Sequence, residues 1–183
     1  MRLYNSYTQA YERPKLRRIV RRLKAAMPDI LEYTGADSVV VSGKSGISVG
    51  FALLLTMDMH LVTVRKPGED SHGAMIEGTD AKELKKYVIL DDFVSSGATV
   101  ERIIASINGR ASGRSDNKPE CVGVVCYQRP TKTEDPGKLH PRSLYSFRTM
   151  GFKVYDGLNS LDEGVATATA KLRMFYTDEP NGE

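Results

Sequence analysis

The sequence predicts an α/β protein with an open, mostly parallel twisted sheet flanked by helices. Short apolar runs of strand length alternate with segments whose apolar residues recur at helical spacing. Three of the apolar runs lead directly into small, polar or charged residues, at 42–46, 65–66 and 91–92. Ligands of open parallel sheets bind at the carboxyl ends of the strands, so these three endings predict one ligand site.

The length and composition predict a single domain spanning 1–183. A chain of 183 residues with 40% apolar content is long enough for one full core. It has no apolar run of about eighteen residues, and its first residues lack the apolar centre of a signal peptide, so we expect a cytoplasmic protein without a membrane partner. The net charge of +3 suits a polyanionic substrate as well as it suits nucleic acid. Cys121 and Cys126 share an apolar run and predict buried thiols, with neither a disulfide nor a metal pair.

The first helix is predicted over Pro14 to Met27. Pro14 suits the first helical position, and Pro28 is expected to end the helix. One face is apolar, and the other carries Lys15, Arg17, Arg18, Arg21, Arg22 and Lys24. Because no aromatic residues interleave with these charges, we interpret the basic face as solvated or as the rim of a subunit contact.

A strand over Ser38 to Val41 is followed by a small polar loop and then by a helix to about Met57. The loop contains Ser42, Gly43, Lys44, Ser45 and Gly46. A helix start leaves backbone N–H groups without partners, so such a loop predicts a phosphate cradle. Gly43, Lys44 and Ser45 also look like the end of a nucleotide-triphosphate loop. That loop requires a glycine five positions earlier, where this chain has Ser38.

The next strand is predicted over Leu61 to Val64, with Arg65 and Lys66 at its end. From Pro67 to about Gly78 there is no periodicity, and this stretch contains His72. Structureless loops of this length in compact domains are commonly functional lids, so we expect the stretch to cover the site.

The central stretch is an apolar strand over 88–90 that ends in Asp91 and Asp92. A helix with apolar residues at 100, 103, 104 and 107 follows it. The loop between them contains Ser95, Ser96, Gly97, Ala98 and Thr99. A loop of this kind before a helix suits a phosphate monoester, whereas two carboxylates repel phosphate and suit a cation or a diol. Each hydrogen bond from a sugar hydroxyl to a carboxylate contributes about 1.5–3 kcal/mol. A phosphate site beside a diol site describes a ribose 5-phosphate.

The remaining elements are predicted from shorter signals. A buried strand is expected over Cys121 to Tyr127, and a last short strand over Phe152 to Tyr155. Ser160 and Glu163 fit a capping box that opens a helix through about Phe175. Residues 177–183 are expected to form a loose tail.

Residues Val88 to Thr99 resemble the phosphoribosyl pyrophosphate signature of the type I phosphoribosyltransferases. An apolar run, two acids and a short spacer precede a small Ser-Gly-x-Thr loop, with Ser96 where threonine is commoner. The resemblance implies the fold of that family, with a core over about 36–128 and a small hood built from about 1–35 and 129–176. It places the ribose hydroxyls and magnesium on Asp91 and Asp92, and the 5-phosphate on the loop Ser95 to Thr99.

The resemblance extends to two other loops. Gly43 to Gly46 resembles the family's pyrophosphate loop, in which Lys44 would meet the pyrophosphate. Arg65, Lys66 and His72 resemble the mobile catalytic loop of the orotate-type enzymes. This chain has acidic residues at 69–70, where the orotate-type loop has a further lysine, so the acceptor base stays open.

The function that the resemblance implies is phosphoribosyl transfer to a nitrogenous base with release of pyrophosphate. The family is often homodimeric, and nucleic acid is not expected as a partner. Two alternatives stay open. One is a regulator with the same fold that senses phosphoribosyl pyrophosphate or a nucleotide and binds nucleic acid through its basic first helix. The other is a nucleotide triphosphatase.

Overall fold

The computed structural model describes residues 13–69, 74–78, 84–92, 97–111 and 118–127, and the strands at 152–154 and 172–176. In chain order the elements are α1 (Arg13–Thr34), β1 (Ser38–Ser42), α2 (Gly43–Leu54), β2 (His60–Val64), β3 (Ile76–Gly78), β4 (Lys86–Asp91), α3 (Ala98–Ala111), β5 (Glu120–Cys126), β6 (Phe152–Val154) and β7 (Leu172–Tyr176).

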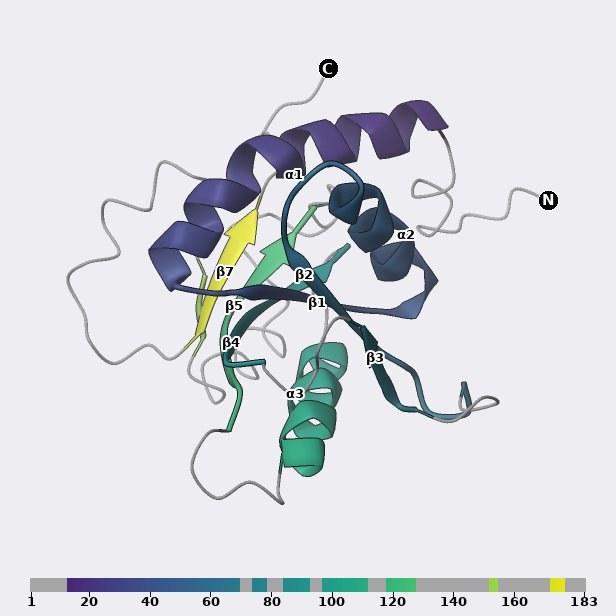
Figure 1. Cartoon of the computed structure of the whole chain (residues 1–183), viewed down its shortest axis with the longest axis vertical. Helices are drawn as coiled ribbons and strands as arrows, with labels where there is room; N and C mark the ends of the chain where they lie inside the picture. The colour runs from purple at the N-terminus through teal and green to yellow at the C-terminus, as the bar shows by residue number, and fades with distance from the viewer. Residues whose placement is uncertain are drawn as a thin grey trace.

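The strands form one sheet in the order β3-β2-β1-β4-β5-β7-β6. Five neighbouring pairs run parallel, and β3 runs antiparallel to β2. Helices α1 and α2 cover one face of the sheet, and α3 covers the other (Figure 1). The predicted open, mostly parallel α/β fold is therefore confirmed. Most of the predicted hood and the tail at 177–183 lie outside the described residues, so the hood and the single-domain organisation stay predictions.

Two apolar layers hold the helices to the sheet because side chains alternate along each strand. In β1, Val39 and Val41 face α1 and α2, whereas Val40 faces α3. In β4, Val88 and Leu90 share the first face with Val39, and the intervening Ile89 lies on the second. Strands buried on both faces cannot slip by one residue without exposing an entire layer. The residues that follow each strand are therefore held at a fixed level.

Helix α1 continues through Pro28, so the prediction that Pro28 ends the helix is wrong. An interior proline removes one hydrogen bond and costs about 3 kcal/mol. Pro28 is exposed, where water can hydrate the carbonyl that it leaves unpaired. Met27 and Ile30 on either side are fully buried, and burial of each such side chain contributes about 1.5–3 kcal/mol. Packing against α2 and the sheet thus outweighs the local signal.

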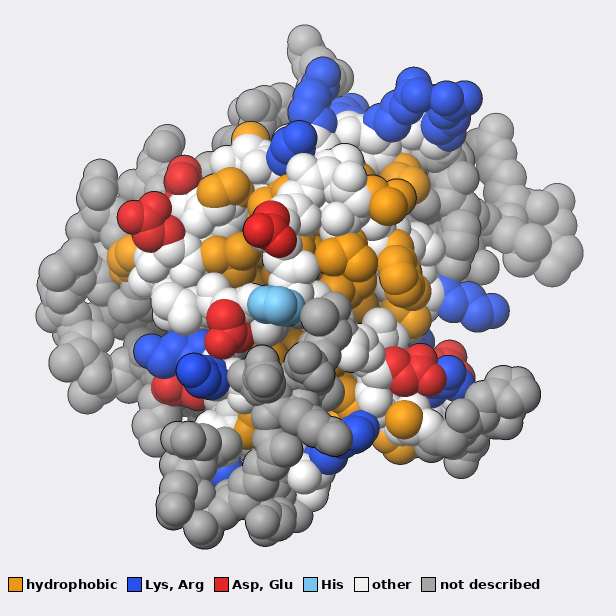
Figure 2. Space-filling model, viewed as in Figure 1, with side chains coloured by type: hydrophobic (Ala, Val, Ile, Leu, Met, Phe, Trp, Pro, Cys, Tyr) orange, Lys and Arg blue, Asp and Glu red, His pale blue; other side chains and the backbone are white. Residues whose placement is uncertain are grey.

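The basic face of α1 is largely solvated, as predicted. Arg17, Arg18, Arg21 and Lys24 are exposed, and Figure 2 shows basic side chains gathered over α1. Arg22 departs from this pattern because it is partly buried and its Nη2 donates a hydrogen bond to the carbonyl oxygen of Tyr127 at 3.3 Å. No described helix combines the length and the apolarity needed to cross a membrane.

Two predicted segments have a different structure. Residues 67–78 were expected to be irregular throughout, but 76–78 form β3 and pair with the end of β2, Ile76 opposite Val64. The predicted helix through Phe175 is wrong at 172–175, which belong to β7. That strand pairs with β5 on one side and β6 on the other, and these neighbours supply its backbone partners. Residues 160–171 lie outside the described residues. Cys121 and Cys126 are buried free thiols, as predicted.

Candidate functional site

The candidate site lies at the carboxyl ends of the central strands. Ser42 at the end of β1 pairs with Val64 at the end of β2, and Asp91 at the end of β4 pairs with Cys126 in β5. After β1 the chain enters α2 on one face of the sheet, and after β4 it leads to α3 on the other face. A ligand crevice is expected where successive connections diverge in this way. Asp91 and Asp92 at the end of β4, and Gly43 at the start of α2, flank that point.

Asp91 and Asp92 form a tight acidic pair. The backbone N–H of Asp92 donates a hydrogen bond to Asp91 Oδ1 at 2.9 Å, and the Asp92 side chain is buried. Burial and the neighbouring Asp92 carboxylate raise the pKa of Asp91 to about 8, and the positive charge of Lys66 opposes this rise in pKa. Two carboxylates so placed favour a cation or a hydroxyl donor beside them.

The segment predicted as a phosphate loop is the first turn of α2. The helix begins at Gly43, whose φ of 69° few other residues adopt. The side chain of the N-cap residue Ser42 does not cap the helix, since its hydroxyl donates instead to the carbonyl oxygen of Val64 at 2.7 Å. The backbone N–H groups of this first turn are therefore not satisfied by Ser42. Gly43, Ser45 and Gly46 are buried, whereas Lys44 is exposed.

Lys66 lies between this turn and the acid pair. A methyl group built on Gly43 would lie 3.0 Å from Lys66 Cε and 3.3 Å from its Nζ. The charge of Lys66 also acts on the pKa of Asp91. The structure therefore brings together Gly43, Lys66 and Asp91, which are distant in sequence.

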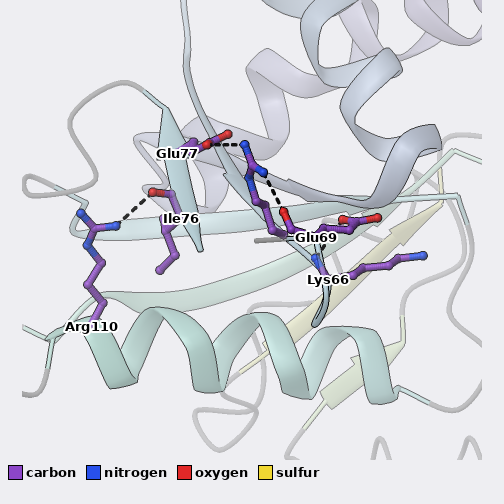
Figure 3. A network of polar contacts seen from close by, with 6 residues as sticks. Lys66, Glu69, Ile76, Glu77 and Arg110 are labelled. Carbon is purple, nitrogen blue, oxygen red and sulfur yellow. Dashed lines mark hydrogen bonds and ion pairs between the residues drawn. The ribbon is translucent and has the colours of Figure 1, made fainter. Parts of the chain in front are cut away.

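Arg65 is held elsewhere. Its Nη2 forms an ion pair with Glu77 Oε1, and its Nη1 donates to the carbonyl oxygen of Glu69 at 2.7 Å (Figure 3). The Glu69 carboxylate accepts a hydrogen bond from the backbone N–H of Lys66 at 3.0 Å. The Arg65 side chain thus braces the start of the loop between β2 and β3.

The predicted 5-phosphate loop is described only at its end. Gly97 is buried with φ 82°, and its carbonyl oxygen accepts the N–H of Glu101 at 2.9 Å. Helix α3 begins at Ala98, so Ala98 and Thr99 lie in its first turn. Ser95, Ser96 and His72 lie outside the described residues, and their predicted roles stay predictions.

Sequence reasoning missed two residues at this end of the sheet. Arg102 of α3 contacts both β1 and the residue after β2, and Tyr127 directly follows β5. Tyr127 is fully buried, and burial followed by the nearby Asp92 charge raises the pKa of its phenol. No sequence signal distinguished Arg102 from the other charged residues of its helix, since its partners are 37 and 60 residues away.

The raised pKa of Asp91 predicts a pH dependence of stability. A carboxyl group with a raised folded-state pKa contributes stability below its unfolded pKa of about 4, and that contribution is lost as the pH rises through about 8. In magnesium-free buffer, we expect the contribution of Asp91 to the free energy of unfolding to fall by at least about 1 kcal/mol as the pH rises from 5 to 8. Urea denaturation of wild type and Asp91→Asn measures this contribution as their difference. A parallel pH dependence of the two proteins contradicts the prediction.

Known proteins resemble this chain in sequence over part of its length and in fold over most of it. No protein-family model matches the chain. A curated hypoxanthine/guanine phosphoribosyltransferase of Methanocorpusculum labreanum is 29% identical over 101 residues, which cover 49% of this chain and 54% of the relative. The chain thus spans about half the length of that relative.

Solved structures resemble the chain over most of its length. Orotate phosphoribosyltransferase of Francisella tularensis has a TM-score of 0.54 at 14% identity and covers 93% of this chain and 69% of its own. The enzyme of the same name from Aeropyrum pernix has a TM-score of 0.54 at 12% identity, with 94% and 76% covered. Orotate phosphoribosyltransferase of Mycobacterium tuberculosis, solved with phosphoribosyl pyrophosphate, has a TM-score of 0.50 at 14% identity, with 94% and 80% covered. The resemblance predicted from residues 88–99 is therefore confirmed, and the chain has the fold of the type I phosphoribosyltransferases.

Proposed function

We propose that the protein transfers ribose 5-phosphate from phosphoribosyl pyrophosphate to a nitrogenous base and releases pyrophosphate. The observation that carries this proposal is the close acid pair at the point where α2 and α3 diverge, together with Lys66, which lies against Gly43 and whose charge acts on Asp91. The relatives named above include phosphoribosyltransferases for hypoxanthine, guanine and orotate, and one was solved with phosphoribosyl pyrophosphate.

Each part of the substrate has a proposed binding group. Asp91 and Asp92 accept hydrogen bonds from the ribose hydroxyls, and the 5-phosphate binds the loop Ser95 to Thr99 at the start of α3. The pyrophosphate binds the first turn of α2, Gly43 to Gly46, and the Lys66 ammonium. Lys44 is the exposed residue of that turn and adds a positive charge to it. Arg65 would have to leave Glu77 to reach pyrophosphate, and His72 belongs to the same loop.

The chemistry requires stabilisation of charge that develops during transfer. A base nitrogen forms a bond to C1 of the ribose as the bond from C1 to pyrophosphate breaks, and the bonding electron pair leaves with pyrophosphate. The ribose ring gains positive charge on the way, so the nearby acid pair stabilises the transition state more than the ground state. Lys66 stabilises the negative charge on the leaving group.

The acid pair also fits magnesium. No group of three or more metal-ligating side chains occurs among the described residues, so a fully protein-bound metal has no cage there. Magnesium commonly binds one or two carboxylates together with substrate phosphates, and the mutual repulsion of Asp91 and Asp92 favours a cation. Magnesium, when bound, would neutralise charge on the pyrophosphate.

Replacement of Gly43 by alanine tests the pyrophosphate end of the site. Alanine at a φ of 69° costs about 1–2 kcal/mol, and its methyl group would displace Lys66. We expect Gly43→Ala to bind phosphoribosyl pyrophosphate about tenfold more weakly by calorimetry. Gly68→Ala is the matched control, because Gly68 has a φ of 84° but a Cβ built there would meet nothing within 4 Å. Equal losses of affinity in both variants would assign the effect to backbone strain alone.

A second candidate function is supported by the exposed basic residues of α1 (Figure 2). A regulator that binds RNA or DNA through this face would show affinity that falls steeply with salt. A triphosphatase is less favoured, because residues 38–42 form β1 and leave no loop before Gly43 to wrap a triphosphate.

A single assay separates these candidates. The protein is incubated with magnesium, phosphoribosyl pyrophosphate and, in turn, orotate, uracil, purine bases and nicotinamide, and pyrophosphate release is followed. We expect release that depends on both magnesium and one class of base. If none of these bases gives pyrophosphate release and the protein binds nucleic acid in a salt-sensitive way, the transferase proposal is contradicted and the regulator is favoured. Hydrolysis of adenosine or guanosine triphosphate would favour the triphosphatase.

A further inference from the structure

Arg102 connects the ends of two strands to α3. Its Nη1 donates a hydrogen bond to the carbonyl oxygen of Arg65 at 2.8 Å, and its Nη2 donates to Ser42 Oγ at 2.7 Å. Ser42 Oγ in turn donates to the carbonyl oxygen of Val64 at 2.7 Å. One guanidinium therefore holds the last residue of β1 and the first residue after β2 in a fixed relation.

Both contacted residues directly precede a group proposed to bind pyrophosphate. Ser42 precedes Gly43, where the first turn of α2 begins, and Arg65 precedes Lys66. Lys66 lies against Gly43, so the relation between these two backbones decides where its ammonium lies. The planar fork of a guanidinium can bond two acceptors on different strands, which a single ammonium on a flexible stem does less well.

We propose that Arg102 is a positioning residue for the pyrophosphate end of the site. This inference rests on the proposed function. In it, Arg102 does not contact the substrate. Its guanidinium sets the distance between the Gly43 turn and Lys66, so that both can bind the same anionic group. Both acceptors of Arg102, Ser42 Oγ and the carbonyl oxygen of Arg65, belong to the pyrophosphate end of the site. We therefore expect loss of this contact to act there more strongly than on the carboxylates or on the 5-phosphate loop that leads into α3.

The chain contains a matched control on the same helix. Arg110 lies eight residues further along α3, and its Nη1 donates to the carbonyl oxygen of Ile76 at 3.0 Å (Figure 3). Both arginines thus bond a backbone carbonyl of the β2–β3 hairpin. Arg110 bonds Ile76 on β3, which pairs with Val64, whereas Arg102 bonds Ser42 and Arg65 themselves. Arg110 thus stabilises the hairpin without a hydrogen bond to the two residues that precede Gly43 and Lys66.

The experiment compares two ligands across three proteins. Wild type, Arg102→Met and Arg110→Met are titrated by calorimetry with magnesium pyrophosphate and with ribose 5-phosphate, and their melting temperatures are recorded. We expect Arg102→Met to weaken pyrophosphate binding about tenfold and ribose 5-phosphate binding by less than about twofold. Arg110→Met is expected to change each affinity by less than about twofold. Equal weakening of both ligands in Arg102→Met, or equal losses in both variants, would show a purely structural role and overturn the proposal.

A milder variant tests the same proposal if Arg102→Met folds poorly. Ser42→Ala removes one acceptor of the guanidinium, and we expect it to weaken pyrophosphate binding more than ribose 5-phosphate binding. An equal effect on the two ligands contradicts the proposal.

The inference and the proposed function can fail separately. If wild type transfers a phosphoribosyl group to no base, but Arg102→Met still loses pyrophosphate affinity selectively, the transferase proposal fails and Arg102 keeps its assignment. If wild type is active and Arg102→Met binds pyrophosphate normally, the transferase proposal stands and the role assigned to Arg102 fails. Wild type that binds no pyrophosphate overturns both.

Discussion

Asp92→Asn is expected to lower the rate of phosphoribosyl transfer by about a hundredfold or more while the protein stays folded. The Asp92 side chain is buried beside Asp91, where its charge is screened less by water and interacts more strongly with a nearby positive charge. Loss of one preorganised group that faces developing charge commonly costs a factor of about 100–1,000 in kcat. Steady-state release of pyrophosphate measures the rate, and circular dichroism reports the fold.

The stability of the same variant separates a site effect from a folding effect. The Asp92 carboxylate contributes to the raised pKa of Asp91, so its neutralisation relieves repulsion in the folded state. We expect the melting temperature of Asp92→Asn at pH 8 to equal or exceed that of wild type. Asp58→Asn, which changes an exposed carboxylate outside the site, is expected to alter neither rate nor melting temperature. Near-normal turnover of Asp92→Asn would count against the assigned role.

Gly78→Ala is expected to cause the largest loss of stability. Gly78 ends β3 with a φ of 134°, and a Cβ there would clash with the carbonyl oxygen of Leu61 and lie 2.9 Å from Val62 Cα. Both contacts are with the backbone of β2, which is fixed between β1 and β3. We expect the free energy of unfolding, measured with urea, to fall by about 2–4 kcal/mol.

Gly35→Ala is the matched control for this loss. Gly35 has a φ of 65°, but a Cβ there would meet only Lys86 Nζ at 3.9 Å, so the cost is confined to backbone strain. We expect a loss of about 1 kcal/mol in this control. If Gly78→Ala loses no more than Gly35→Ala, the close approach of β3 to β2 does not contribute to stability.

Local sequence patterns predicted the central strands and the groups at their ends. The apolar run before Asp91 and Asp92 and the small residues around Gly43 are each contained in a few consecutive residues, so the sequence displays them directly. The parallel order followed from the alternation of strands and helices. Because the fold is confirmed, short apolar runs that end in small or charged residues were the signal that located the central strands.

Features that depend on distant partners were missed. The role of Arg65 at the pyrophosphate stays a prediction, but the ion pair of its guanidinium with Glu77 was not foreseen, because the sequence did not reveal β3 as a strand. The capping box at 160–163 predicted a helix that reached Phe175, but residues 172–176 form β7, which pairs with two other strands. The predicted end of the first helix at Pro28 is wrong, because the helix continues and buries Ile30. In each case tertiary packing outweighs a local preference of a few kcal/mol.

A crystal soaked with magnesium and ribose 5-phosphate would show whether the sugar binds beside the acid pair. We expect the 2- and 3-hydroxyls to lie within hydrogen-bond distance of the Asp91 and Asp92 carboxylates, and the phosphate to lie at the start of α3 beside Gly97. A sugar bound at another edge of the sheet, or carboxylates turned away from its hydroxyls, would contradict this expectation.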